Sequence, residues 1–122
     1  QTGNGRTGAW FAFQHHGIKP DVLTTAKGLG NGIPIGVCMM SGPAVDLFKV
    51  GQHGSTFGGN PFACAVALTV LEVIEAEHLL PRVTQAGQNL LKQLQQAFHD
   101  HPSVQSIRGS GLMIGIECHQ PC

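Results

Sequence analysis

Residues 21–36 read DVLTTAKGLGNGIPIG, a stretch in which a strand-like apolar run delivers a single lysine, Lys27, into a glycine-rich loop. Only the neutral form of a lysine amine attacks a carbonyl, and a place at the end of a buried strand favours that form by desolvation. The neighbouring glycines let the backbone turn tightly and leave room for a flat ligand. The stretch therefore predicts a lysine that bonds covalently to a bound aldehyde. The alternative is a surface lysine whose stem lies along apolar neighbours.

Composition narrows the possible partners. The chain has 122 residues, enough for one domain, and its seven Lys and Arg balance seven Asp and Glu. Because no field of one sign exists, we expect neither nucleic acid nor an anionic membrane as a partner. The apolar runs are far shorter than the ~20 residues of a membrane helix, which predicts a soluble, cytoplasmic protein. Residues 1–8 contain neither a start methionine nor a secretory signal, so we expect a piece of a longer protein.

The cysteines and histidines predict no metal site. Cys38 and Cys64 lie in apolar stretches that predict a core strand and a core helix, and no pair of cysteines has Cys-x-x-Cys spacing, which favours a reducing compartment. Residues 118–122, CHQPC, suggest metal ligation, but no second pair of ligands accompanies them. The seven histidines lack the His-x-x-x-His spacing that would place two on one helical face.

The first half of the chain shows an alternating α/β pattern. Residues 9–16 predict a short amphipathic segment, residues 22–25 a strand, and residues 36–40 a strand covered on both faces. Pro43 predicts a short helix through Phe48. Asn60 as N-cap and Pro61 in the first turn predict a helix to about Glu77. Its expected buried face consists of Phe62, Val66, Ala67, Val70, Val73 and Ile74.

The second half differs in pattern. An amphipathic helix ending before Pro102 is predicted by its apolar positions Leu80, Val83, Leu90, Leu91, Leu94, Ala97 and Phe98. Strands are predicted at residues 104–108 and 112–117, with glycines between them. The change of pattern predicts a domain boundary near residues 77–82. Residues 3–8 match Gly-x-Gly-x-x-Gly, but too few helix-forming residues follow for a dinucleotide-binding fold, so nucleotide binding is rejected.

Four segments together resemble class III pyridoxal-phosphate-dependent aminotransferases. In chain order they are QTGNGRTG (1–8), TAKGLGNGIP (25–34), HGSTFGGNP (53–61) and IRGSGL (107–112). The resemblance implies an α/β fragment of a fold type I, aspartate aminotransferase-like enzyme. Residues 1–78 would form the C-terminal part of the large, mixed-sheet cofactor-binding domain, and residues 79–122 the start of the small α+β C-terminal domain.

The resemblance also implies roles for five residues. Lys27 matches the lysine that bonds to the cofactor, pyridoxal 5'-phosphate, and then moves the proton at the substrate carbon. Thr56 matches the residue that binds the cofactor phosphate, and Gln1 matches one that flanks the pyridine ring. Ser55 is similar to a residue that contacts the acylated substrate. Arg108 matches an arginine that binds a carboxylate, for which its guanidinium fork is suited, although a structural surface arginine is the alternative.

Within the class the motifs are most similar to those of acetylornithine aminotransferases, with succinylornithine aminotransferases close behind. The resemblance implies transfer of an amino group between N2-acetylornithine and 2-oxoglutarate, in arginine biosynthesis, by a homodimer with a shared active site. Ornithine and 4-aminobutyrate aminotransferases carry similar loops and remain alternatives, as does a noncatalytic truncated product. The family's aspartate that pairs with the pyridine nitrogen would precede Gln1, so we expect the isolated chain to be inactive.

Overall fold

The computed structural model describes residues 1–120, and these divide into two compact units. Unit 1 contains Gln1 and Phe13–Glu77, whereas unit 2 contains Thr2–Ala12 and the chain from His78 onward. The residues Pro121 and Cys122 of the CHQPC run lie outside the described residues. Each unit joins helices to a two-stranded antiparallel sheet.

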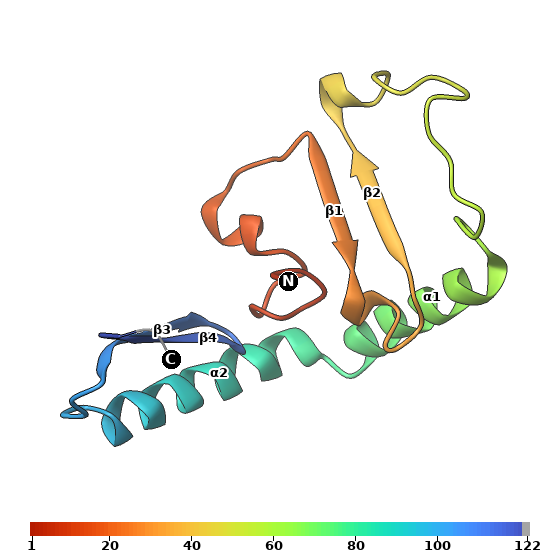
Figure 1. Ribbon diagram of the computed structural model, residues 1–122. Helices are drawn as coiled ribbons and strands as arrows, with labels where there is room; N and C mark the ends of the chain where they lie inside the picture. Colours follow the sequence, from red (N-terminus) through yellow and green to blue (C-terminus); the bar gives the residue numbers. More distant parts are fainter. Residues whose placement is uncertain (121–122) are drawn as a thin grey trace. The chain divides into compact units, whose positions relative to one another are not determined.

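In unit 1, strands β1 (Val22–Ala26) and β2 (Gly36–Met40) pair antiparallel, with Ala26 opposite Gly36 (Figure 1). Both predicted strands are confirmed. The prediction that residues 36–40 are covered on both faces is wrong, because Cys38 and Met39 are exposed. Within residues 1–120 the sheet contains only these two strands, and the side chains of β2 are at most half-buried. Cys38 is therefore not a core residue of this chain.

Helix α1 (Pro61–Ala76) starts as the sequence predicts. The Asn60 side chain accepts a hydrogen bond from the Ala63 amide at 2.9 Å, and Pro61 occupies the first turn. The buried residues are Ala63, Ala67 and Ile74, so the prediction holds for the last two. It is wrong for Phe62 and Val73, which are exposed, and Cys64 is exposed rather than in the core. The element of unit 1 that packs most against α1 within residues 1–120 is a short 3₁₀ turn, which is consistent with this narrow buried stripe.

The segment between β2 and α1 forms little regular structure. A 3₁₀ turn, η3 (Gly42–Ala44), replaces the helix predicted from Pro43 through Phe48. Ala44 is buried, but Val45, Leu47 and Phe48 are all more than half exposed, so burial would contribute little to the stability of a helix here. The predicted amphipathic segment at residues 9–16 contains a second 3₁₀ helix, η1 (Ala12–His16).

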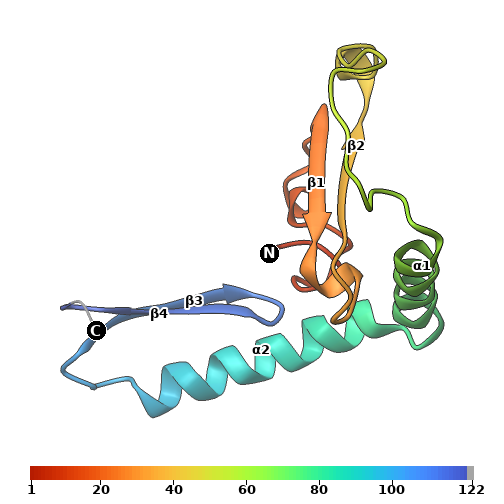
Figure 2. The same ribbon diagram turned by 45° about the vertical axis from the view of Figure 1, so that its right-hand side comes forward.

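In unit 2, helix α2 (Leu79–Ala97) lies along a hairpin of β3 (Val104–Ser110) and β4 (Met113–Cys118), as Figure 2 shows. The predicted helix and both strands are confirmed. Of the predicted apolar face, Leu80, Val83, Leu91, Leu94 and Phe98 are half-buried, whereas Leu90 and Ala97 are exposed. Gln95 Nε2 donates to the Ile107 carbonyl at 3.1 Å and fastens the helix to the hairpin.

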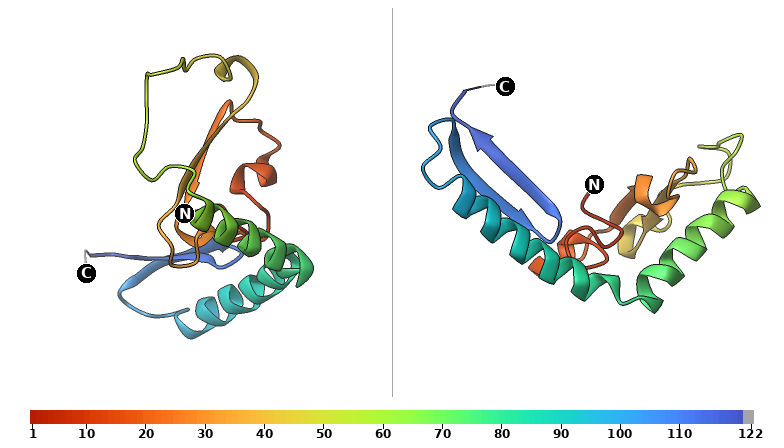
Figure 3. Two further views of the ribbon diagram at one scale, coloured as in Figure 1. Left: turned by 90° about the vertical axis from the view of Figure 1, so that its right-hand side faces the viewer. Right: turned by 90° about the horizontal axis from the view of Figure 1, so that it is seen from below.

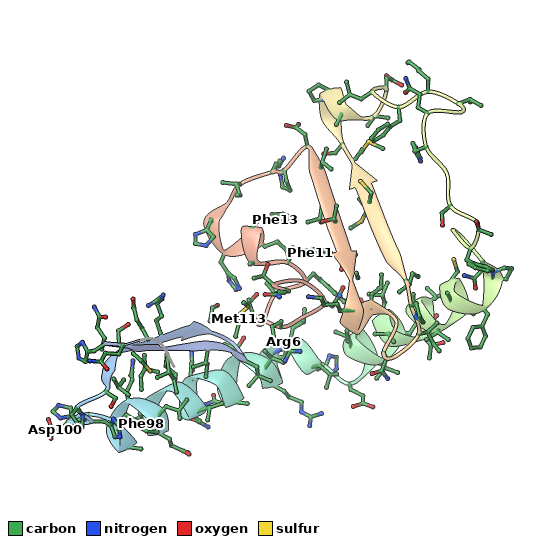
Figure 4. All side chains as sticks on the ribbon, viewed as in Figure 1. Arg6, Phe11, Phe13, Phe98, Asp100 and Met113 are labelled. Carbon is green, nitrogen blue, oxygen red and sulfur yellow. The ribbon has the colours of Figure 1, made fainter. Side chains whose placement is uncertain are left out.

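Residues 2–12 also belong to unit 2, although they stand far from α2 and the hairpin in sequence. The Leu112 amide donates to the Arg6 carbonyl at 2.9 Å, at the turn between β3 and β4 (Figure 3). Figure 4 shows Arg6 and Met113 close to each other at this point. The Gly-x-Gly-x-x-Gly run thus packs against the hairpin turn, and no long helix follows it.

Three glycines allow this close packing. A β-carbon added to Gly8 would lie 2.2 Å from Thr84 Oγ1, and one added to Gly87 of α2 would lie 2.1 Å from the Gly111 carbonyl oxygen. One added to Gly111 would meet the Thr7 backbone at 2.6 Å, and Gly111 also has a φ of +55°. At Gly87 and Gly111 backbone therefore meets backbone, and at Gly8 the backbone meets the Thr84 side chain.

We predict that Gly87→Ala destabilises unit 2 by about 1–3 kcal/mol, because the new methyl group overlaps the Gly111 carbonyl and backbone must shift. The thermal unfolding temperature of the protein that carries this chain should fall accordingly. Gly115→Ala in β4 is the matched control, since a β-carbon there meets no atom within 4 Å. Equal effects of the two substitutions would contradict the packing argument.

Of the helices in residues 1–120, none combines the length and the apolar composition that a bilayer crossing needs.

Candidate functional site

Unit 1 contains a pocket of about 840 Å³ beside Lys27, a volume typical of small-molecule sites. The end of β1, the turn before β2, the loop before α1 and the first turn of α1 surround it. Its lining residues are Ala26, Lys27, Gly32, Ile33, Pro34, Ile35, Gly36, Ser55, Phe57, Gly58, Gly59, Asn60, Ala63 and Cys64. Lys27 supplies the only amine of this lining.

Local structure holds Lys27 in an unusual backbone conformation. It begins a 3₁₀ turn, η2 (Lys27–Leu29), with a φ of +53°, which costs a residue with a β-carbon about 1–2 kcal/mol relative to its preferred conformations. Leu29 in the same turn is buried, and η2 packs against α1. The Gly30 amide closes the turn by donating to the Lys27 carbonyl at 3.0 Å. Strain maintained by surrounding contacts is typical of functional positions.

The expectation that a buried strand desolvates Lys27 is wrong for this chain. Val22 of β1 is 47% exposed, and Lys27 itself is exposed at the pocket. Thr25 and Ala26, at the end of β1 next to Lys27, are half-buried rather than buried, and the sheet has two strands within residues 1–120. The structure instead fixes the orientation of the Lys27 backbone through a strained turn.

The loop before α1 is a pair of overlapping turns. The Gly58 amide donates to the Ser55 carbonyl at 3.4 Å, and the Asn60 amide donates to the Phe57 carbonyl at 3.3 Å. Asn60 Nδ2 donates to the same Phe57 carbonyl at 2.8 Å. These bonds carry the loop directly into the capped start of α1 and place Ser55 in the pocket wall.

Of the five predicted site residues, the structure brings Lys27 and Ser55 together. Thr56 is exposed and does not line the pocket, although both of its neighbours do. Gln1 is exposed and is also absent from the pocket wall. Arg108 belongs to unit 2.

Sequence reasoning missed several wall residues. Phe57 lines the pocket and is 79% exposed. It belongs to the HGSTFGGNP motif and lies two residues after Ser55, and this proximity could have predicted its place in the pocket wall. Asn60 was assigned only as a helix cap, yet it also lines the pocket. The sequence predicts Cys64 in the core, but Cys64 is exposed and lines the pocket.

Arg108 on β3 belongs to a polar cluster on the hairpin. Its Nη1 donates to Glu117 Oε2 at 2.5 Å and to Ser106 Oγ at 3.2 Å, and Ser106 Oγ donates to the same Glu117 oxygen at 2.9 Å. The hydrogen bond from Arg108, followed by that from Ser106, lowers the pKa of the Glu117 carboxyl group. Both charged side chains are substantially solvent-exposed.

The lowered pKa of Glu117 predicts a pH dependence. Because the carboxyl group has a lower pKa in the folded state, its contribution to stability is present above the ordinary carboxyl range and is lost as the pH falls through the lowered pKa. The small difference in unfolding temperature between the native protein and Glu117→Gln should therefore be constant near neutral pH and shrink below about pH 4. It should also shrink in roughly 1 M salt, since the pair is exposed. A difference independent of pH would contradict this assignment.

Cys38 and Cys64 are exposed free thiols, and Cys118 is half-buried. In residues 1–120, no three His, Cys, Asp or Glu side chains lie close enough together to hold a metal ion.

A family profile described as "Aminotransferase class-III" matches residues 1–122. The chain belongs to the class-III aminotransferase family. It is 50% identical over all its 122 residues to a protein named acetylornithine aminotransferase from Nitrosomonas europaea, of which it covers 31%. The chain thus spans about three tenths of the length of this relative. Members of the family are pyridoxal-phosphate-dependent enzymes.

Solved structures of class-III aminotransferases share the fold. Acetylornithine aminotransferase from Elizabethkingia anophelis matches with a TM-score of 0.89 at 36% identity, over 98% of this chain and 30% of the other. Ornithine aminotransferase from Toxoplasma gondii matches with a TM-score of 0.89 at 39% identity, over 96% of this chain and 28% of the other. The α/β chain therefore has the fold of part of a fold type I enzyme.

The pocket of unit 1 fits the family's cofactor. Pyridoxal phosphate is a flat aldehyde, which requires an amine beside an open slot. Lys27 supplies the amine, and a β-carbon added to Gly32, Gly36 or Gly59 meets no atom within 4 Å, so side chains at these wall positions would occupy open space. The residues present are thus compatible with a planar ring held at Lys27.

Proposed function

We propose that the whole protein carrying this chain is a cytoplasmic, pyridoxal-phosphate-dependent aminotransferase for N2-acetylornithine and 2-oxoglutarate. It would form N-acetylglutamate 5-semialdehyde and glutamate, a step of arginine biosynthesis. The observation that carries the proposal is Lys27, held at a φ of +53° in the wall of a pocket shared with Ser55. The identity to a relative named acetylornithine aminotransferase supports the choice of substrate.

Three residues of unit 1 would take part in the cofactor chemistry. When bound, the cofactor supplies an aldehyde that captures amino groups and a ring that withdraws electrons. The Nζ atom of Lys27 would hold the cofactor and, once displaced by the incoming amine, accept and return the proton at the carbon that bears the amino group. Gln1 would flank the ring, and the Thr56 hydroxyl would bind the phosphate.

The substrate would be recognised by other residues of the chain. Ser55, in the pocket wall beside Phe57, would contact the acyl group of the donor. Arg108 would bind a substrate carboxylate through its planar fork of donors. In this proposal residues 1–78 belong to the large domain and residues 79–122 to the small one. The proposed protein is a homodimer with a shared site. The free thiols of Cys38 and Cys64 suit a cytoplasmic enzyme.

An assay of amino donors tests this function. The whole protein, loaded with pyridoxal phosphate and supplied with 2-oxoglutarate, should form glutamate from N2-acetylornithine with a kcat/KM at least about tenfold above that for ornithine or 4-aminobutyrate. N2-succinylornithine should come closest to the preferred donor. Ser55→Ala should reduce this preference without abolishing turnover. Absence of glutamate with all four donors would overturn the aminotransferase proposal.

Ornithine is the second candidate donor, because the chain matches the Toxoplasma gondii ornithine aminotransferase structure at 39% identity. A higher kcat/KM for ornithine in the same assay would select this alternative. N2-Succinylornithine and 4-aminobutyrate stay in the donor panel for the same purpose.

A further inference from the structure

The hairpin of unit 2 presents two different faces. Neighbouring residues along a strand point to opposite faces, so Ile107 and its partner Ile116 share one face. The other face carries Ser106 directly opposite Glu117, and Arg108 two residues along β3 on the same side. The polar cluster is thus set by the register of the hairpin.

Arg108 is held through one nitrogen atom of its guanidinium group. Nη1 makes both of its hydrogen bonds, to Glu117 and to Ser106. Within residues 1–120, Nε and Nη2 make none, although a guanidinium carries donors on all three nitrogens. The edge formed by Nε and Nη2 has the geometry for a bidentate carboxylate.

The residue opposite Arg108 on β4 is a glycine and has no side chain. Gly115 faces Arg108 across the hairpin, and a β-carbon added to Gly115 meets no atom within 4 Å. A ligand group can therefore approach this face beside the guanidinium without displacing a neighbouring side chain.

We propose that Glu117, together with Ser106, is a positioning residue that anchors Nη1 of Arg108 and keeps its Nε and Nη2 edge open for a substrate carboxylate. The inference rests on the proposed function, which assigns carboxylate binding to Arg108. The anchor lowers the conformational entropy that a long, exposed side chain loses on binding. Glu117 acts through Arg108 and does not itself contact the substrate.

The test measures binding of glutarate, an unreactive dicarboxylate, to the whole protein loaded with pyridoxal phosphate, by calorimetry. Glu117→Ala should weaken glutarate binding about fivefold, and Ser106→Ala by a smaller factor. Glu117→Gln retains an acceptor oxygen for Nη1. Its affinity for glutarate should therefore be close to that of the native protein and no lower than that of Glu117→Ala. Asp100→Ala is the charge control, because it removes an exposed carboxylate of the same unit that pairs with His99 and not with Arg108.

A double mutant separates positioning from a general structural effect. Arg108→Ala should weaken glutarate more than about tenfold, and adding Glu117→Ala to it should cause no further loss. An equal loss in both backgrounds, or no loss with Glu117→Ala alone, would overturn the proposal. If Arg108→Ala leaves glutarate binding intact while glutamate is still formed, this inference fails and the proposed function stands. If glutarate binding changes as expected in all variants but the native protein forms no glutamate, the proposed function is rejected and the anchoring of Arg108 by Glu117 stands.

Discussion

Replacing Lys27 with alanine should lower the turnover of the whole protein by at least about 1,000-fold, because the substitution removes both the covalent anchor of the cofactor and the group that moves the proton. Binding of pyridoxal phosphate should weaken but persist, since ring and phosphate contacts come from other residues. Turnover is measured as glutamate formation, and cofactor binding by absorbance after gel filtration.

Chemical labelling identifies the lysine independently of the substitution. The native protein loaded with pyridoxal phosphate should show a visible absorption band, and borohydride reduction should fix the cofactor on the peptide that contains Lys27. Lys19 and Lys49 are the nearest alternatives in sequence. Finding the label on either of them would remove the assignment of Lys27.

Lys27→Gly is the matched control for backbone strain. Glycine adopts a φ of +53° without the cost that a β-carbon brings, so this variant should be more stable than Lys27→Ala by about 1 kcal/mol. Its turnover should be as low as that of Lys27→Ala, because both variants lack the amine. Substantial turnover in either variant would show that the amine is dispensable.

Mixing two inactive variants of the whole protein, Lys27→Ala and Thr56→Ala, should restore activity once subunits exchange. The prediction follows from Thr56, which is excluded from the pocket wall of its own chain although Ser55 and Phe57 line it. If Thr56 binds the phosphate of the cofactor held by the other subunit, one of the two sites in a mixed dimer has both residues intact.

The expected activity is about half that of the native protein for the fraction of dimers that are mixed. Exchange is verified by labelling each variant with a different affinity tag and isolating dimers that carry both. A doubly substituted variant, Lys27→Ala with Thr56→Ala, mixed with Thr56→Ala is the control, because no site then combines Lys27 with an intact Thr56. Verified exchange without recovery would contradict the shared site.

Sequence patterns alone predicted the four strands and the two α-helices of residues 1–120, because these elements depend on local chemistry. Asn60 and Pro61 mark the start of α1 through hydrogen-bonding and backbone preferences that act within four residues. The apolar spacing of α2 and the glycines between β3 and β4 are local in the same way. The residues of the motifs were also enough to predict the family and to single out Lys27 and Ser55, which share one pocket.

Burial was predicted less well, since it depends on what covers an element. The apolar run at residues 36–40 predicted a strand covered on both faces, but Cys38 is exposed in a sheet of two strands. The run from Pro43 to Phe48 predicted a helix, but Val45, Leu47 and Phe48 stay more than half exposed, and so little burial does not repay the entropy of helix formation.

The tertiary structure decided the contacts between residues far apart in the chain. It brings the loop of Ser55 to the end of β1, and it packs residues 2–12 against α2 and the hairpin turn. The residues next to Gly87 and Gly111 in sequence do not indicate that these two glycines lie close together. Both must be glycine only because their backbones meet in the folded chain. The positive φ of Lys27 and the anchor of Arg108 on Glu117 have the same origin, since local propensity favours neither and only the folded chain holds them in place.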